Sequence, residues 1–202
     1  MRGLLNFEKA YFESKNEYGF PEVFPYKTKV SCNKWIDFDG SRKQTGQAAE
    51  GLHFYCDDYK FNCLWTDPQR YVPILQRYKY VVMPDFSLYY NFPVALQIYN
   101  KYRNHWLYAY FLVHGIQMIP NISVSTPDCY DWSFLGLPLG SVVAFSDVGA
   151  IRDKASREAT MQGYDAMIKK LQPTQILYFT RSIKTTPSEC DVVEIPFLKN
   201  RG

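Results

Sequence analysis

The chain has 202 residues, of which 47% are apolar and 21% charged, and its formal net charge is +3. This length and composition are ordinary for a globular protein with one substantial core. The small charge argues against a strongly basic nucleic-acid-binding domain, and no apolar run approaches the ~18 residues of a membrane span. We therefore expect a cytoplasmic protein without a membrane partner.

The cysteines and histidines give no sign of a structural metal site. The cysteines show no CxxC pair and no zinc-finger spacing, and the histidines do not cluster. An odd number of thiols fits a reducing cytosol. We predict buried, inert thiols at Cys32, Cys56, Cys63, Cys129 and Cys190.

Residues 1–50 differ from the rest of the chain, because they are rich in Phe, Tyr, Lys and Asn and show weak periodicity. Within them, Lys27–Phe38 predicts one or two strands, and the small polar stretch Gly40–Gly51 predicts a loop. We interpret residues 1–202 as a single α/β domain in which this irregular N-terminal segment packs on a βα core.

From residue 51 onward, apolar strand-like segments alternate with helical patterns. Their nearly continuous apolar runs are typical of parallel strands that are buried on both faces. A last run, Val192–Leu198, predicts an edge strand, because Pro196 cannot donate to a central ladder. The five main segments, each ending in a polar or acidic cluster, are His53–Asp58, Tyr80–Ser87, Ile116–Ser123, Ser141–Asp147 and Gln175–Arg181.

Helices are predicted between these strands. An Asp-Pro pair supplies an N-cap and a first-turn proline for a short helix over residues 68–78. A longer helix starts at Pro93, carries apolar residues at three- and four-residue spacing, and stops near Gly115. A third helix covers residues 154–171, whereas residues 124–140 form an irregular connection.

Two architectures fit this alternation. Strand starts lie roughly 25–35 residues apart, which is the length of a βα unit. One possibility is a small or incomplete βα barrel, and the alternative is an open doubly wound sheet. We favour the barrel-like form, because polar residues recur at nearly every strand end. In both folds the carboxyl ends of parallel strands share one rim, and a site is predicted there.

Asp85 is the first candidate for a catalytic residue at this rim. Pro84 stiffens the backbone where the strand leaves the sheet, so the carboxylate sits on a rigid support. It could act as a general base, a nucleophile or a metal ligand, and the alternative is an aspartate that braces a loop. Ser87, two residues later, points the same way in an extended chain and could bind substrate.

Two other strand ends carry candidate catalytic carboxylates. Asp57 and Asp58 end the first segment, where one side chain can face inward and the other outward, and we take Asp57 as the candidate. Asp147 ends the fourth segment and could pair with Asp85, so that the two carboxylates divide the acid and base roles. The alternative for each is a turn or helix-capping role.

The remaining candidates would bind substrate. Asn121 and Ser123 end the third segment and could donate hydrogen bonds, although a turn-forming Asn is an equal alternative. Arg42 and Lys43 lie in the predicted loop, and with Arg181 they could bind phosphate or carboxylate. The alternative is a solvated basic loop. No P-loop, GxGxxG, GxSxG or HExxH motif accompanies them.

Five stretches resemble one protein family: GSRK near residue 40, HFYCDDYKF, PDFSLYYNFPVALQIYNKYR at 84–103, GIQMIPNIS at 115–123 and GSVVAFSDVG at 140–149. They look like a domain of unknown function found in phages and mobile elements of Gram-positive bacteria. The resemblance covers residues 25–180 and carries over no established reaction. It implies a phage or mobile-element protein in the host cytoplasm, with a role in replication or against host defence.

Three functions stay open on the sequence. The first is an enzyme acting on a nucleotide or nucleic acid through strand-end carboxylates, by hydrolysis or transfer at a glycosidic or phosphate bond. Its carboxylates could hold Mg²⁺ or Mn²⁺, although no dedicated metal ligands are predicted. The second is a non-catalytic protein that binds a host defence protein or a nucleotide signal. The third is a nucleic-acid-binding replication accessory.

Overall fold

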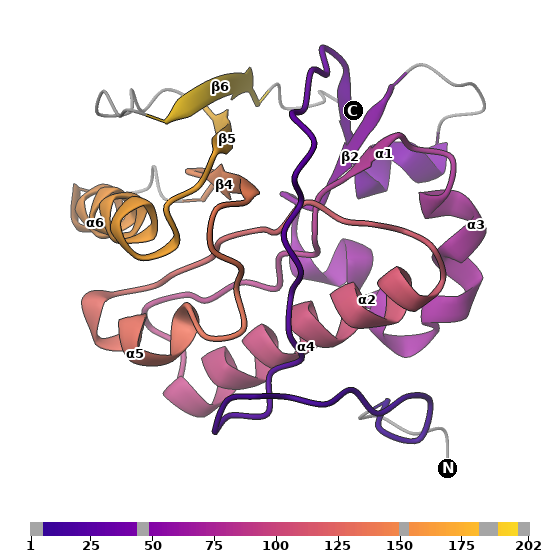
Figure 1. The fold of residues 1–202 in the computed structure, drawn as a ribbon, viewed down its shortest axis with the longest axis horizontal. Helices are drawn as coiled ribbons and strands as arrows, with labels where there is room; N and C mark the ends of the chain where they lie inside the picture. The colour runs from indigo at the N-terminus through magenta and orange to yellow at the C-terminus, as the bar shows by residue number, and fades with distance from the viewer. Residues whose placement is uncertain (1–5, 44–48, 150–153, 182–189, 198–202) are drawn as a thin grey trace.

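The computed structural model describes residues 6–43, 49–149, 154–181 and 190–197. Within these ranges the chain is mixed α/β, with two three-stranded parallel sheets in the orders β1-β2-β3 and β4-β5-β6 (Figure 1). The strands are β1 (Trp35–Asp37), β2 (Gly51–His53), β3 (Tyr80–Val81), β4 (Val142–Ser146), β5 (Gln175–Thr180) and β6 (Asp191–Pro196). The helices are α1 (Phe38–Lys43), α2 (Asp58–Thr66), η1 (Pro68–Tyr71), α3 (Val72–Leu75), α4 (Val94–Val113), η2 (Pro127–Cys129), α5 (Tyr130–Ser133) and α6 (Lys154–Leu171).

Two isolated parallel bridges join the sheets through one further segment. Val82 bridges Ile119, and Asn121 bridges Ala144, so residues 119–121 lie between β3 and β4. The strands therefore follow one another in chain order, all parallel. This order is the pattern of repeated βα units.

The strands curl around an interior of aromatic rings. Trp35 of β1 lies edge-on to Phe179 of β5 at 5.1 Å between centroids, and His53 of β2 lies 4.9 Å from the same ring. The outer strands β1 and β6 do not pair within the described residues, so no closed barrel forms there. The predicted α/β class with mainly parallel strands is confirmed, and the arrangement is open, which agrees with the open alternative and not with a closed barrel.

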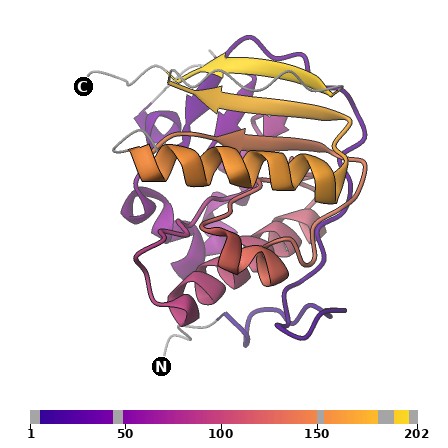
Figure 2. The same cartoon turned by 90° about the vertical axis from the view of Figure 1, so that its left-hand side faces the viewer.

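Helices cover the sheets because the strands are apolar on both faces. The α6 helix lies over β4 and β5 (Figure 2), where Tyr164 and Met167 pack with Phe145 and Tyr178. The longest helix, α4, packs Trp106 and neighbouring side chains into the core that also contains β2 and β3 residues. These two layers leave the carboxyl ends of the strands free to form a rim.

The N-terminal segment closes the opposite end of the sheet, and Figure 1 shows it crossing the molecule in indigo. The Tyr26 carbonyl accepts a hydrogen bond from the Val142 amide at 2.8 Å, and the Val30 amide donates to Gln175 Oε1 at 2.8 Å. Val142 and Gln175 are the first residues of β4 and β5. The segment therefore satisfies polar groups at the amino-terminal ends of these strands, away from the rim.

The loop predicted over Gly40–Gly51 is wrong in its first part, because α1 extends through Lys43. Asp37 Oδ1 accepts a hydrogen bond from the Gly40 amide at 2.5 Å, which satisfies a first-turn donor of this helix. The basic side chains in the last turn also complement the helix dipole. Residues 44–48 of the predicted loop lie outside the described ranges.

The strand predicted over His53–Asp58 is displaced toward the N-terminus. In the structure β2 ends at His53, and Asp58 already begins α2, a helix that the sequence interpretation missed. A side chain at Gly51 would clash with Trp35, since its Cβ would lie 2.4 Å from the indole ring. The glycine thus permits the close approach of β1 and β2.

The strand predicted over Tyr80–Ser87 is limited to Tyr80–Val81, and the one predicted over Ile116–Ser123 forms only isolated bridges. The remaining predicted elements agree more closely with the structure. The α4 helix begins after Pro93 and is followed by Gly115 at φ +79°, and α6 covers its predicted range. The helix predicted over residues 68–78 is present in part, as η1 and α3. The edge strand predicted over Val192–Leu198 corresponds to β6, although Leu198 lies outside the described residues.

Candidate functional site

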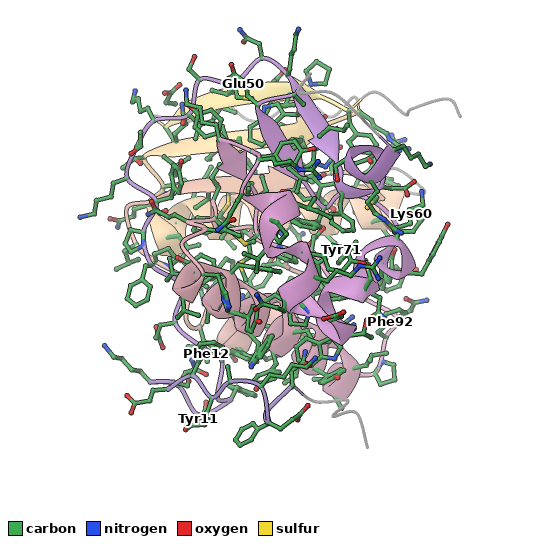
Figure 3. The ribbon with its side chains drawn as sticks, turned by 90° about the vertical axis from the view of Figure 1, so that its right-hand side faces the viewer. Tyr11, Phe12, Glu50, Lys60, Tyr71 and Phe92 are labelled. Atoms are coloured by element: carbon green, nitrogen blue, oxygen red, sulfur yellow. The ribbon has the colours of Figure 1, made fainter. Side chains whose placement is uncertain are left out.

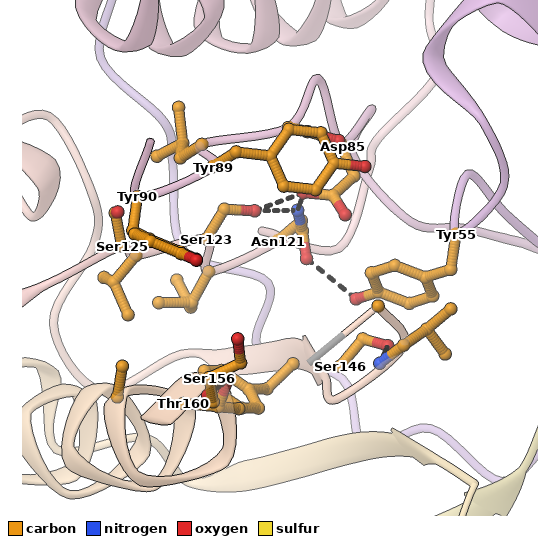
Figure 4. A pocket seen from close by; sticks show the side chains of 18 of the residues that line it. Tyr55, Asp85, Tyr89, Tyr90, Asn121, Ser123, Ser125, Ser146, Ser156 and Thr160 are labelled. Carbon is orange, nitrogen blue, oxygen red and sulfur yellow. Dashed lines mark hydrogen bonds between the residues drawn. The ribbon is translucent and has the colours of Figure 1, made fainter. Parts of the chain in front are cut away.

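A pocket of about 260 Å³ opens at the rim, the edge at which the sequence predicts a site (Figure 4). Residues after β2, after β3 and around 121–125 form one side, and the end of β4 with the first turns of α6 forms the other. Pockets of this size hold a small molecule rather than a polymer. The polar lining residues are Tyr55, Asp85, Ser87, Tyr89, Tyr90, Asn91, Asn121, Ser123, Ser125, Ser146, Ser156 and Thr160.

Asp85 lies at the centre of a hydrogen-bond network in this pocket. Asn121 Nδ2 donates to Asp85 Oδ1 at 2.8 Å, and the Ser123 hydroxyl donates to the same oxygen. The Tyr55 hydroxyl in turn donates to Asn121 Oδ1 at 2.7 Å, which fixes the amide orientation (Figure 4). Three of the predicted site residues therefore meet, although they come from segments more than 30 residues apart.

Burial raises the pKa of Asp85 to about 6. The hydrogen bonds from Ser123 and Asn121 act in the opposite direction, whereas the negative charge of Asp58 adds to the rise in pKa. Desolvation dominates because a carboxylate loses its hydration when it is enclosed. A carboxyl group with this pKa can both accept and release a proton near neutral pH.

The α4 helix holds the backbone next to Asp85 in place. Asn104 accepts from the Phe86 amide at 2.8 Å and donates to the Phe86 carbonyl at 3.2 Å. One turn earlier, Asn100 donates to the Ser87 carbonyl at 2.7 Å. The two asparagines are four residues apart and share one helix face, so the segment is anchored to a rigid element. These hydrogen bonds join the PDFS stretch (residues 84–87) to the NKYRN stretch (residues 100–104) of α4.

Asp57 and Asp58 divide into one outward and one inward side chain. The Ser87 hydroxyl donates to Asp58 Oδ1 at 2.8 Å, and the Ser87 amide donates to Asp58 Oδ2 at 3.1 Å. The side chain of Asp57 is 68% exposed and pairs with Lys60 at 3.6 Å, and Figure 3 shows Lys60 at the edge of the molecule. Asp57, the candidate chosen from the sequence, lies outside the pocket lining, and its neighbour Asp58 reaches the lining through Ser87.

Asp147 is also separate from the pocket lining. It is fully buried and accepts hydrogen bonds from Thr180 Oγ1 at 2.6 Å and from the Arg181 amide at 3.0 Å. The Tyr178 hydroxyl donates to it as well, at 3.2 Å. Both carboxylate oxygens therefore bind groups of β5 and the residue after it, so the structure does not pair Asp147 with Asp85.

The predicted basic substrate-binding residues do not converge on the pocket. Lys43 pairs with Asp39 at 3.1 Å, and Arg42 reaches the Lys60 carbonyl at 3.5 Å. The Arg181 guanidinium lies 4.8 Å from the centre of the Phe197 ring. In the described part of the chain, the lining contains no Lys, Arg or His.

Sequence reasoning missed several residues of the pocket wall. Tyr55 lies within the first predicted segment, where its role depends on contact with Asn121, 66 residues later. Ser156 and Thr160 of α6 lie across the pocket from Tyr89 and Tyr90 (Figure 4). Their four-residue spacing in the first turns after a strand end was a usable signal, since such residues share a helix face.

The described residues do not form a metal site. They contain no group of three or more His, Cys, Asp or Glu side chains that could hold a metal ion. In those same ranges, Asp85 is the one carboxylate of the pocket lining, whereas Mg²⁺ and Mn²⁺ sites need several oxygen ligands. The residues at this rim therefore do not fit the Mg²⁺ or Mn²⁺ that the strand-end carboxylates suggested.

A family profile described as "Domain of unknown function (DUF4417)" matches residues 12–196. The chain belongs to this family. The Gene 1 protein of Mycobacterium phage L5 is 32% identical over 185 residues, which cover 92% of this chain and 79% of that protein. The Gene 1 protein of Mycobacterium phage D29 is 32% identical over 190 residues, which cover 93% of this chain and 68% of that protein.

These relatives confirm the resemblance to a phage family of unknown function. No solved structure matches the chain. Within the described ranges, no helix combines the length and apolar character needed to cross a bilayer.

Proposed function

We propose that this protein is an enzyme that acts at the glycosidic bond of a nucleoside, nucleotide or nucleic-acid unit, with Asp85 as its proton-transferring group. The observation that carries the proposal is the setting of Asp85, a carboxyl group with a pKa of about 6 in a pocket of small-molecule size. Strongly shifted pKa values of this kind concentrate at functional sites.

The lining favours a glycosidic over a phosphate bond. Enzymes that transfer phosphoryl groups surround them with Lys, Arg or metal ions. Among the described residues the pocket lining offers none of these cations, whereas hydroxyl and amide groups are abundant. Tyr89 and Tyr90 at the edge of the pocket are 43% and 64% exposed, so they are available to stack on a base.

Asp85 would act first as a base and then as an acid. With a pKa of about 6 it is mostly ionised at neutral pH. It takes a proton from a water molecule that attacks the glycosidic carbon, the bond to the leaving group breaks, and Asp85 returns the proton to that group. Asn121 and Ser123 hold the carboxylate in one orientation during both transfers.

The test is a turnover assay on nucleosides, nucleotides and short single-stranded oligonucleotides, with the released base measured by chromatography. We expect Asp85→Asn to lower the rate by at least about 100-fold, the usual contribution of general acid–base catalysis. Asp57→Asn is the matched control, because Asp57 is an exposed aspartate outside the pocket lining. Equal rates for the parent protein and Asp85→Asn would overturn the proposal.

A second candidate function is supported by exposed aromatic and apolar side chains in residues 89–96. Val94 and Leu96, at the start of α4, are 58% and 40% exposed and follow the exposed Tyr89 and Tyr90. Exposed aromatic and apolar side chains can serve as anchors in a non-catalytic protein that binds a host protein or a nucleotide signal. Under this alternative, Tyr90→Ala abolishes partner binding, and Asp85→Asn leaves it unchanged.

A further inference from the structure

We infer that the pocket binds one neutral, hydroxyl-bearing sugar ring, as in a nucleoside or a simple glycoside, and holds it between Asp85 Oδ2 and Ser125 Oγ with any phosphate group outside. The inference rests on the proposed function for the choice of site, and it names the class of ligand. It concerns binding, so it can be tested separately from turnover.

The first argument is the unequal use of the two Asp85 oxygens. The hydrogen bonds from Asn121 and Ser123 both reach Oδ1. Asp85 is half-buried and lines the pocket, so its second oxygen is left to accept a hydrogen bond from a ligand. A sugar hydroxyl is a suitable donor, since carboxylates form short, strong hydrogen bonds with O–H groups.

The second argument is the unpaired hydroxyl of Ser125. Ser125 is 7% exposed, lines the same pocket, and its Oγ has no hydrogen-bond partner among the described residues. A buried hydroxyl without a partner costs free energy, so such groups in native proteins usually have a ligand or water partner. Figure 4 shows Ser125 beside Ser123, on the Asp85 side of the pocket.

The third argument concerns which other polar groups are already occupied. Ser87 donates to Asp58, and Ser146 donates to the Phe179 carbonyl at 3.0 Å. Thr160 donates to the Ser156 carbonyl at 2.9 Å. Of these lining Ser and Thr hydroxyls, that of Ser125 has no partner in the described part of the chain. With Asp85 Oδ2 it offers a ligand one donor and one acceptor, which matches the paired donor and acceptor capacity of a hydroxyl-bearing ring.

The negative charge of Asp85 disfavours a phosphate at this position. A phosphate beside ionised Asp85 would meet a like charge, and the described lining contains no cation to offset it. A volume of about 260 Å³ accommodates a sugar with a small substituent. The first turns of α6 also border the pocket, and helix N-termini attract anions. The decisive comparison is therefore the affinity for a nucleoside against the affinity for its nucleotide.

The experiment is titration calorimetry of the full chain with adenosine, methyl ribofuranoside and adenosine 5′-monophosphate. We expect adenosine to bind at least about tenfold more tightly than its monophosphate. The reason is that the phosphate of the monophosphate would be repelled by ionised Asp85. Binding of methyl ribofuranoside would identify the sugar ring as the recognised group, and binding of adenosine alone would identify the nucleoside as its source. Equal or tighter binding of the monophosphate, or no binding of any compound, overturns the inference.

Ser125→Ala tests the proposed contact, and Ser133→Ala is its matched control. Both serines are buried, and neither hydroxyl has a hydrogen-bond partner in the ranges that the structure describes, but Ser133 lies outside the pocket lining. We expect Ser125→Ala to weaken adenosine binding by up to about tenfold, the value of one hydrogen bond, with no change for Ser133→Ala. Unchanged affinity in Ser125→Ala contradicts the proposed contact.

Failure of the inference can be distinguished from failure of the proposed function. Adenosine that binds in the pocket without being cleaved contradicts the enzyme and leaves the ligand class intact. Cleavage of nucleotides with no preference for nucleosides contradicts the ligand class and leaves the enzyme intact.

Discussion

Asp85 and Asp147 follow strands that are close in the sheet, yet their surroundings differ. Asp147 is fully buried, and Thr180, Tyr178 and the Arg181 amide together occupy both of its oxygens. Asp85 is half-buried, and Asn121 and Ser123 both bind one oxygen. The hydrogen bonds of Asp147 hold the turn after β4 against β5. Those of Asp85 leave its second carboxylate oxygen as an acceptor at the pocket.

This difference shows why residue type and position on a strand are insufficient to identify a site. A carboxylate whose oxygens are both paired within the protein has no capacity left for a ligand, whereas a partly paired one does. The environment also matters, because burial with few compensating donors raises the pKa of Asp85 to about 6. Saturation of hydrogen bonds therefore separates the structural aspartate from the candidate functional one.

The comparison is tested most severely by Asp147→Ala and Asp85→Ala. Removal of the Asp147 carboxylate takes away the acceptor of three buried or part-buried hydrogen bonds, so we expect the free energy of unfolding to fall by roughly 3 kcal/mol. Asp85→Ala should change it by less than about 1 kcal/mol, because Asn121 keeps Ser123 as a partner and a buried charge is removed. Urea denaturation of both variants measures this, and equal losses would contradict the assignment.

The pH dependence of stability gives a second test. Because burial raises the folded-state pKa of Asp85 from 3.8 to about 6, the folded state holds this proton more tightly than the unfolded state. The contribution of Asp85 to stability is therefore greatest below about pH 4 and is lost as the pH rises to 6, by up to roughly 3 kcal/mol. As the pH rises from about 4 to 6, Asp85→Asn should become more stable relative to the parent. Above pH 6 the difference in stability should stay constant.

The difference in stability between the parent protein and Asp85→Asn separates the effect of Asp85 from that of His53. Burial lowers the pKa of His53 to about 3, so its contribution to stability is lost in the opposite direction, as the pH falls below 6.5. That term is common to the parent and to Asp85→Asn, and it cancels. Denaturant titrations at pH 4, 5, 6 and 7 provide the measurement, and a difference that does not vary with pH would contradict the raised pKa.

The smallest expected effect concerns the two adjacent aspartates. Asp58 binds both the hydroxyl and the amide of Ser87, so Asp58→Ala should cost about 1 to 2 kcal/mol of stability. Asp57→Ala should cost no more than about 0.5 kcal/mol, because its pairing with Lys60 is exposed. Loss of the Asp58 charge should also lower the pKa of Asp85, seen as a lower pH midpoint in the preceding experiment. Identical effects of the two substitutions would show that Asp58 does not support the pocket.

The sequence predicted the strands and long helices well where local patterns are strong. The continuous apolar runs at β4 and β5, and the proline and glycine at the ends of α4, depend on nearby residues alone. It failed at β2 and α1, where a short strand and a side-chain bond to the first helical turn decided the boundaries. It also predicted longer strands over Tyr80–Ser87 and Ile116–Ser123 than the two-residue β3 and the isolated bridges that form there. Short elements carry too few residues for a periodic pattern to define them.

For the candidate site, the sequence by itself determined that polar residues stand at the carboxyl ends of parallel strands and that Asp85 follows a proline. Only the tertiary structure decided which of them meet. It brought Asn121 and Ser123 to Asp85, turned Asp58 inward and Asp57 outward, and saturated Asp147 with partners from β5. The reason is physical: hydrogen-bond partners, burial and pKa depend on segments tens of residues apart, and only packing of the strands in three dimensions places those segments in contact.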